Sequence, residues 1–380
     1  MNLALALALA LSSIGAAAPV QDPAVRDVSE LLRPICEEHE LPALAGAVVS
    51  GGRTAAVGAV GHRAKGSEKE VATSDRFHLG SCTKSMTATL VATFVEEGKL
   101  AWTTTVGETF RDLGKSMDPA WKDVTLEQLL WHRAGAPEDL REGGLWSRLF
   151  KRKGKPTEQR MDLVRGVLAH PPVSEPGTKF LYANAGYAIA GAMVERTAKE
   201  PWEDLMRERI FEPLGMTSAG FGAPGTKGKL DEPLGHDAGG NPVEIGPRDD
   251  NPPAIGPAGT AHATLGDWGK YVAMHLQGDR LLRPETFAKL HEPAAGAGNR
   301  YAMGWVVLDR DWGGGRVLMH NGSNTMWYCV AWMAPEKGFA VLAATNQGGP
   351  KAAKACDDAA SALIRETVKD AGPAKRDGGR

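Results

Sequence analysis

Strand-like segments lie at both ends of this chain, and helix-like segments fill its middle. Near the start, residues 44–50 and 53–60 are short apolar runs that flank Gly51 and Gly52, the pattern of a β-hairpin with a glycine turn. Four further apolar or alternating runs cover residues 301–308, 317–320, 327–333 and 338–345. Because strand edges seek partners, the simplest fold pairs the N-terminal hairpin with the C-terminal strands in one antiparallel sheet.

Helical periodicity accounts for much of the rest. The expected helices cover residues 25–39, 83–97, 126–132, 184–198, 265–277 and 351–369. This order predicts an α/β protein of the α+β type, with an antiparallel sheet flanked by helices and an inserted helical lobe. We expect one domain over residues 24–370, in which 24–80 and 300–370 form the sheet lobe and 81–299 the mostly helical lobe.

Four stretches lie outside these periodic elements. Residues 3–11 are apolar and are followed by small residues up to Ala18, so residues 1–18 are predicted to be a signal peptide for export to the periplasm or the medium. The apolar run is too short to span a bilayer. Residues 141–157 and 213–260 lack a clear period and are predicted to be long surface loops. Residues 371–380 are expected to form a flexible tail.

Charge and residue usage narrow the class of partner. The 44 Lys and Arg residues nearly balance the 46 Asp and Glu residues, so no overall field attracts nucleic acid or an anionic membrane surface. The four cysteines are widely scattered and the histidines occur singly, so no metal site and no cofactor is expected. A small-molecule or peptide-like substrate fits this composition best, and the oligomeric state is left open.

The first chemical signal is a serine placed before a helix. Ser81 directly precedes the apolar helix expected from residue 83, and Lys84 lies on the same face one turn later. The helix dipole favours negative charge at the serine oxygen, and a nearby lysine can take part in its deprotonation. An S-x-x-K spacing also arises by chance, and a serine before a helix is most often a cap, so the pair needs support from elsewhere.

Two further segments supply that support. Tyr182 and Asn184 lie at the start of another expected helix, which covers residues 184–198. Tyr182 can act as a general base if a cation such as Lys84 lowers its pKa. Asn184 offers a donor and an acceptor to a substrate amide or to Lys84. Gly322 and Ser323 follow a predicted strand, where glycine permits close approach of a ligand to the backbone.

Together these segments resemble the serine β-lactamase and penicillin-binding superfamily, in particular class C β-lactamases and their esterase and D-amino-peptidase relatives. The resemblance covers roughly residues 25–369 and extends to connecting segments. These are residues 129–135, 175–177, 211–216 and 301–305. It implies a β-lactamase/transpeptidase-like fold.

The resemblance also implies roles for individual residues. Ser81 would attack the carbonyl, while Lys84 and Tyr182 together manage its proton. Asn184 would position the acyl side of the substrate. The backbone N–H groups of Ser81 and Ser323 would form the oxyanion hole. His132, within a family-like segment, is expected to make a structural hydrogen bond.

The departure from the family pattern is His320. Members that recognise β-lactams usually carry lysine at this position, to meet the substrate carboxylate, whereas this chain has His320-Asn321-Gly322. Histidine is only fractionally charged near neutral pH. We therefore expect His320 to contact the substrate. We also expect ester or amide substrates to be preferred over lactams that carry a carboxylate.

The sequence thus predicts a serine hydrolase that forms an acyl-enzyme on Ser81 and cleaves an ester, an amide or a lactam. Esterase-like or D-amino-peptidase-like activity is favoured. The alternatives are a D,D-carboxypeptidase or β-lactamase, and a penicillin-binding sensor that is acylated without turnover.

Overall fold

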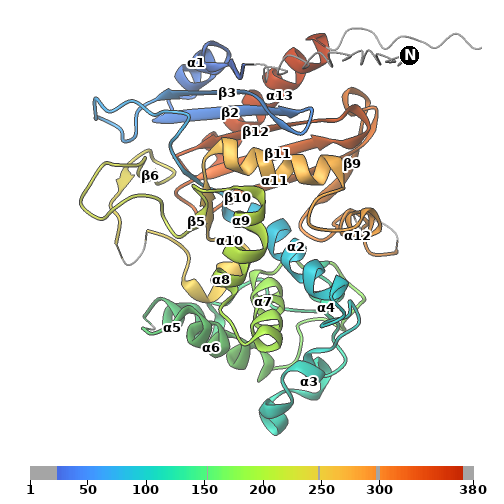
Figure 1. Ribbon diagram of the computed structural model, residues 1–380. Helices are drawn as coiled ribbons and strands as arrows, with labels where there is room; N and C mark the ends of the chain where they lie inside the picture. The colour runs from blue at the N-terminus through green and yellow to red at the C-terminus, as the bar shows by residue number, and fades with distance from the viewer. Residues whose placement is uncertain (1–23, 152, 247–248, 297–299, 371–380) are drawn as a thin grey trace, which may run out of the picture.

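The computed structural model describes residues 24–151, 153–246, 249–296 and 300–370 (Figure 1). The expected signal peptide at residues 1–18 and the expected tail at residues 371–380 lie outside these ranges, so both stay predictions. No helix within the described ranges is both long and apolar enough to cross a membrane.

A seven-stranded sheet joins the two ends of the chain, in the order β1-β3-β2-β12-β11-β10-β9. Its strands are β1 (Arg26–Asp27), β2 (Ala43–Ser50), β3 (Arg53–Gly61), β9 (Val306–Arg310), β10 (Gly315–Ser323), β11 (Tyr328–Ala334) and β12 (Phe339–Thr345). β2 pairs antiparallel with β12, from Leu44 opposite Thr345 to Ser50 opposite Phe339. The predicted pairing of the N-terminal hairpin with the C-terminal strands is therefore confirmed.

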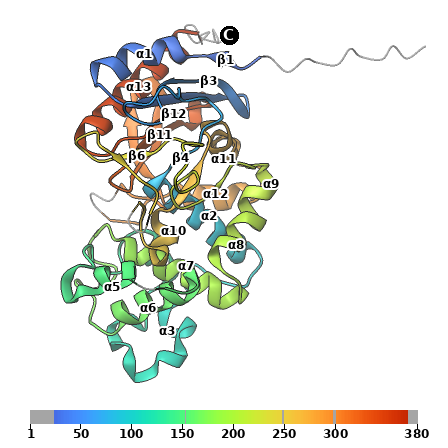
Figure 2. The same ribbon diagram turned by 90° about the vertical axis from the view of Figure 1, so that its left-hand side faces the viewer.

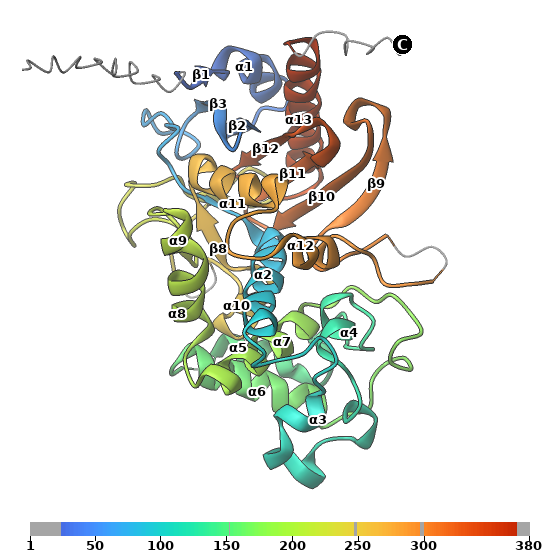
Figure 3. The same ribbon diagram turned by 45° about the vertical axis from the view of Figure 1, so that its right-hand side comes forward.

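Helices cover both faces of this sheet, as Figures 1 and 3 show. α1 (Ser29–Glu38) and α13 (Pro350–Asp370) pack together on one face, and α11 (Leu265–Gln277) packs against β2, β3 and β12 on the other. All but the last residue of β2 is buried. Every residue of β12 is buried as well, and burial on both faces explains why β2 and β12 read as continuous apolar runs rather than as alternating patterns.

The first predicted helix was placed too early. Residues 25–39 were expected to be helical, but Arg26 and Asp27 form β1, which pairs parallel with β3. The Asp27 carboxylate accepts the N–H of Ser29, so the helix begins at Ser29. A side chain that accepts a free backbone N–H at this point favours the start of the helix there.

The remaining helices gather mainly at the end of the molecule opposite α1 and α13 (Figures 1 and 2). They are α2 (Thr83–Glu96), α3 (Val106–Thr109), α4 (Leu126–Leu130), α5 (Leu145–Lys151), α6 (Pro156–Leu168), α7 (Asn184–Ala198), α8 (Trp202–Met206), α9 (Glu212–Leu214), α10 (Gly256–Gly259) and α12 (Pro284–Leu290). Residues 141–157 are thus not simply a loop, since they contain α5 and the start of α6. Leu145 and Leu149 of α5 are buried, and that burial stabilises a helix too short to be stable alone.

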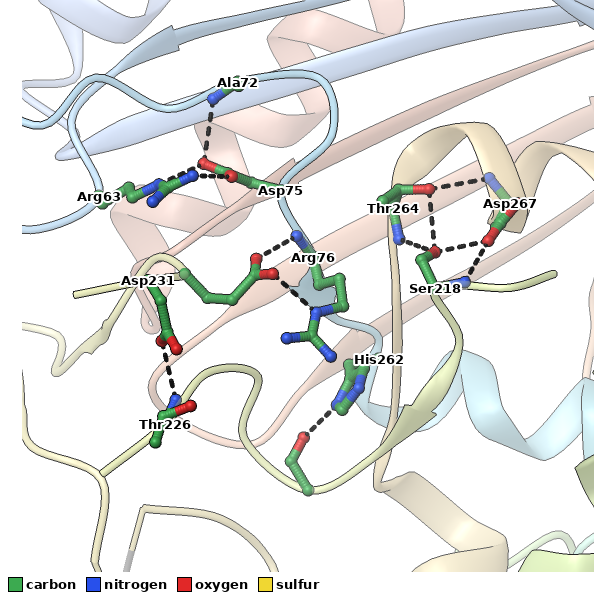
Figure 4. A network of polar contacts seen from close by, with 12 residues as sticks. Arg63, Ala72, Asp75, Arg76, Ser218, Thr226, Asp231, His262, Thr264 and Asp267 are labelled. Atoms are coloured by element: carbon green, nitrogen blue, oxygen red, sulfur yellow. Dashed lines mark hydrogen bonds and ion pairs between the residues drawn. The ribbon is translucent and has the colours of Figure 1, made fainter. Parts of the chain in front are cut away.

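The other predicted loop, residues 213–260, also contains short elements. These are β5 (Gly220–Phe221), β6 (Gly235–His236), β7 (Pro242–Val243) and α10. Polar contacts fasten this segment to its surroundings (Figure 4). Arg76 binds Glu232, the His262 ring contacts the Gly222 carbonyl, and Ser218 donates to Asp267. A second small sheet results, in the order β4-β8-β5, with β4 at Phe77–His78 and β8 at Ala261–Ala263.

A buried ion cluster holds the helices of this lobe together. Arg160 of α6 is fully buried and donates to Glu195 of α7 and to Glu203 of α8. Burial raises the pKa of the Glu195 carboxyl, although the Arg160 cation opposes that rise. Loss of one partner would leave the other buried without compensation.

We therefore predict that Arg160→Ala lowers the free energy of unfolding by about 3–5 kcal/mol, measured by urea denaturation. Without Arg160 the Glu195 carboxylate is buried and unpaired, so it takes up a proton more readily. The deficit should be larger at about pH 8 than at about pH 5, where protonation relieves the buried charge.

Arg165→Ala is the matched control, because Arg165 also lies on α6 but is exposed and pairs with Asp162. Its loss should cost less than about 0.5 kcal/mol. Equal effects of the two substitutions would show that burial of the Arg160 cluster is not what stabilises this lobe.

Candidate active site

Ser81 lies in a tight turn between β4 and α2. Gly80, Ser81 and Cys82 form a single 3₁₀ turn, and Gly80 has a φ of +47°, which favours glycine. The Thr83 hydroxyl donates to the Gly80 carbonyl (2.7 Å) and accepts the N–H of Ala261 (3.0 Å). β8 therefore holds the turn, and Ser81 stands half-buried at the N-terminal end of α2, where negative charge is favoured.

Lys84 is fully buried beside Ser81, surrounded by uncharged oxygens. Its Nζ lies 3.0 Å from Ser81 Oγ, 2.8 Å from Asn184 Oδ1 and 2.8 Å from the Ala258 carbonyl. Burial lowers the pKa of the Lys84 ammonium to about 7. A neutral amine has two N–H groups, which the two carbonyl oxygens accept, so its lone pair is left for the Ser81 hydroxyl proton.

Tyr182 contacts the same two groups. Its hydroxyl hydrogen-bonds the Ser81 side chain, and Lys84 Nζ lies 4.7 Å from the centre of its ring. Tyr182 would act as a general base only if a cation such as Lys84 lowered its pKa, and this condition is not met. Burial raises the pKa of the Tyr182 hydroxyl above its ordinary value, and the hydrogen bond with Ser81 only partly offsets that effect. Tyr182 is therefore a proton donor at neutral pH.

His132 orients the segment that carries Tyr182. Its Nδ1 accepts the N–H of Ala183 (3.1 Å), its carbonyl accepts the N–H of Leu181 (2.8 Å), and its ring lies 4.3 Å from the Tyr182 ring, centre to centre. The expected structural hydrogen bond of His132 is confirmed. Asn184 is the first residue of α7, and its side-chain oxygen accepts a hydrogen bond from Lys84. Lys84 was one of the two partners expected for Asn184, the other being a substrate amide.

β10 passes directly over the Ser81 turn. A Cβ atom added at Gly322 would lie 2.0 Å from the Leu79 carbonyl oxygen and 2.8 Å from the Ser81 nitrogen. One added at Gly80 would lie 2.3 Å from the Ser323 nitrogen. The absence of a side chain at position 322 thus allows the backbone of β10 to approach the backbone of the Ser81 turn. The N–H groups of Ser81 and Ser323 therefore belong to two segments in direct contact. The Ser323 side chain turns away and donates to the Trp327 carbonyl.

His320 is buried and already has partners at both ring nitrogens. Its Nε2 lies 3.0 Å from the Tyr301 hydroxyl and its Nδ1 2.5 Å from the Asn321 carbonyl oxygen. In this arrangement His320 holds Tyr301, whose ring lies 4.7 Å from that of His132, rather than presenting a nitrogen to solvent. Sequence reasoning missed Ala258, which acts through its carbonyl, because any residue type can supply a backbone oxygen.

A cavity of about 820 Å³ lies beside Asn251 and Thr260, and neither Ser81 nor Lys84 lines it. Its walls include Phe150, Phe221 and Asn251. The Asn251 side chain donates to the Gly259 carbonyl (2.8 Å), next to the Ala258 carbonyl that contacts Lys84. The cavity is of the size that small-molecule sites usually have.

Comparison with known proteins shows which family this chain belongs to. The Beta-lactamase family model matches residues 28–365. The chain belongs to the β-lactamase family. It is a serine hydrolase of the superfamily that also contains the penicillin-binding proteins.

Relatives of this β-lactamase-family hydrolase carry different activities in their names. It is 28% identical over 330 residues to penicillin-binding protein 4 of Amycolatopsis lactamdurans, an alignment that covers 82% of each chain. It is 25% identical over 349 residues to an unguisins hydrolase of Aspergillus campestris, covering 86% of this chain and 62% of the relative. An octameric penicillin-binding protein homologue from Pyrococcus abyssi has the same fold, with a TM-score of 0.71, 23% identity, and coverage of 89% of this chain and 76% of that one.

The contact between β10 and the Ser81 turn yields a prediction. Gly322→Ala adds a methyl group where only 2.0 Å separates it from a backbone oxygen, so β10 must shift away from Ser81. We expect the hydrolase to lose activity by about 100-fold or more, as when one oxyanion donor is removed, measured as kcat on its best ester.

Gly266→Ala is the control, since Gly266 lies in α11 and a Cβ added there would lie 3.8 Å from Thr264 Oγ1, an ordinary van der Waals contact. Activity should be unchanged in that variant. Full activity of Gly322→Ala would mean that the backbone contact does not set the geometry of the site.

Proposed function

We propose that this hydrolase cleaves carboxylic esters or amides through an acyl-enzyme on Ser81. The observation that carries the proposal is the position of Lys84 Nζ, 3.0 Å from Ser81 Oγ in a buried, uncharged setting. An amine whose pKa lies at about 7 is an effective base at neutral pH, because it combines a free lone pair with adequate basicity.

In the proposed acylation, the Ser81 proton passes to Lys84 as Oγ attacks the substrate carbonyl. The oxyanion accepts hydrogen bonds from the N–H groups of Ser81 and Ser323. Tyr182 gives its proton to the departing oxygen or nitrogen, and the Lys84 ammonium beside its ring then restores it. Water next attacks the carbonyl of the acyl-enzyme ester and loses its proton to neutral Lys84. The Lys84 ammonium then gives this proton to Ser81 Oγ as the acyl C–O bond breaks, so the acid product leaves and both Ser81 and neutral Lys84 are restored.

The residue at position 320 of β10 bears on substrate preference. The family position that usually carries lysine holds His320, whose nitrogens are engaged by Tyr301 and by the Asn321 carbonyl. This position therefore presents no ammonium to a substrate carboxylate, which favours neutral esters and amides. Esterase-like or D-amino-peptidase-like activity remains our first proposal.

A D,D-carboxypeptidase or β-lactamase activity is the second candidate. It is favoured by the 28% identity to a penicillin-binding protein over 82% of this chain. Hydrolysis of nitrocefin would support it. Stable labelling by a fluorescent penicillin without turnover would instead indicate a sensor.

The first test removes the nucleophile. Ser81→Ala should lower hydrolysis of p-nitrophenyl acetate to the uncatalysed rate, because no acyl-enzyme can form. Ser85→Ala is the matched control, since the Ser85 hydroxyl donates to the Cys82 carbonyl, and it should keep most of the activity. Equal rates for wild type and Ser81→Ala would overturn the proposal.

The second test is the pH dependence of acylation. Because neutral Lys84 is the base, kcat/KM should rise with pH and level off above the Lys84 pKa of about 7. Below that pH, each unit should cost about tenfold, because the ammonium form has no lone pair. A rate that is flat between about pH 5 and 9 would exclude Lys84 as the base.

A further inference from the structure

Asp250 is a buried carboxylate that bridges the two segments of the proposed oxyanion hole. It lies between β7 and the 3₁₀ turn Pro253–Ile255, and its side chain is only 9% exposed. Its Oδ1 accepts the N–H of Asn251 (2.6 Å) and an Nδ2–H of Asn324 (2.9 Å). The same oxygen lies 2.9 Å from His78 Nε2. Three nitrogens from separate parts of the chain therefore converge on one oxygen.

The His78 side of this arrangement leads to Ser81. His78 is fully buried, and its Nδ1 accepts the N–H of Gly80 (3.0 Å). A neutral ring that accepts at Nδ1 carries its proton on Nε2, the atom that faces Asp250. The contact is short but not aligned as a linear hydrogen bond, so the attraction is between the ring N–H dipole and the carboxylate charge. Asp250 thereby favours the tautomer that can hold Gly80.

The Asn324 side leads to Ser323. Asn324 is buried directly after Ser323, and its Oδ1 accepts the N–H of Met326 (3.2 Å). Its amide group thus links the turn between β10 and β11 to Asp250. Since Gly80 and Ser323 are themselves in backbone contact, movement of either segment changes the spacing between the Ser81 and Ser323 N–H groups.

We propose that Asp250 is a positioning residue that fixes the spacing of the two oxyanion donors, through His78 on one side and Asn324 on the other. This inference rests on the proposed function, because the spacing matters only when an oxyanion forms between those donors. Asp250 contacts neither Ser81 nor Lys84 in this arrangement. Loss of Asp250 should therefore weaken binding of the transition state, while binding of the substrate in its ground state should be unchanged.

The test compares Asp250→Ala with Asp250→Asn on p-nitrophenyl acetate. Asp250→Ala should lower kcat by about 10- to 100-fold with KM changed less than about twofold, the signature of an interaction made only in the transition state. Asp250→Asn keeps an oxygen for Asn251 and Asn324, so it should recover kcat to within about fivefold of wild type. Asp249→Ala, at the adjacent position, is the control and should change neither constant.

Hydrogen–deuterium exchange supplies a readout that does not need catalysis. Peptides that contain Gly80 and Ser323 should exchange faster in Asp250→Ala, because the bond from Gly80 to His78 and the turn at Asn324 are loosened. If wild type proves inactive, the proposed function fails, and this exchange alone decides whether Asp250 positions the two segments.

Several results would overturn the inference. They are an unchanged kcat in Asp250→Ala, an effect on KM alone, or unchanged exchange at Gly80 and Ser323. Should Asp250→Ala fail to fold, Asn324→Ala removes one side of the bridge only. It should lower kcat by about 3- to 10-fold, and an unchanged kcat would again overturn the inference.

Discussion

The close contact between β10 and the Ser81 turn is the constraint on which this structure depends. Gly322 and Gly80 allow two backbones to approach more closely than side chains permit. β10 belongs to the large sheet, whereas Ser81 lies in the turn directly before α2, which runs into the helical lobe (Figure 3). The contact therefore brings the two parts of the chain together at the point where the proposed nucleophile lies. Short β4 and β8 support the turn from the other side through Thr83 and Ala261.

The second constraint is electrostatic. Lys84 is buried against carbonyl and hydroxyl oxygens, none of which carries a charge. A carboxylate beside Lys84 would favour the ammonium form of its side chain, whereas burial without a charged partner disfavours that form. The same burial keeps the Tyr182 hydroxyl protonated. One environment thus moves two pKa values in opposite directions, which supplies the base and the acid that the proposed mechanism needs on either side of Ser81.

Membership of the β-lactamase family does not by itself define the substrate. The relatives include a penicillin-binding protein and an unguisins hydrolase, and the penicillin-binding protein homologue from Pyrococcus abyssi, which has the same fold, is 23% identical. In this chain, His320 is tied to Tyr301 within an aromatic group that also contains His132 and Tyr182. Because one fold can carry many functions, we expect substrate choice to depend on how these rings shape the surroundings of Ser81.

The sequence by itself predicted the pairing of the terminal strands, the positions of α1, α2, α4, α7, α11 and α13, and the grouping of Ser81, Lys84, Tyr182 and Asn184. The elements follow from local periodicity, whereas the grouping of the four residues follows from three short motifs and the family resemblance that they carry. Only the tertiary structure decided the direction of the Tyr182 pKa shift, the internal partners of His320, the Ala258 carbonyl at Lys84 and the bridge formed by Asp250. The physical reason is that desolvation and backbone contacts arise between residues far apart in the chain, and a residue's type does not reveal what will surround it.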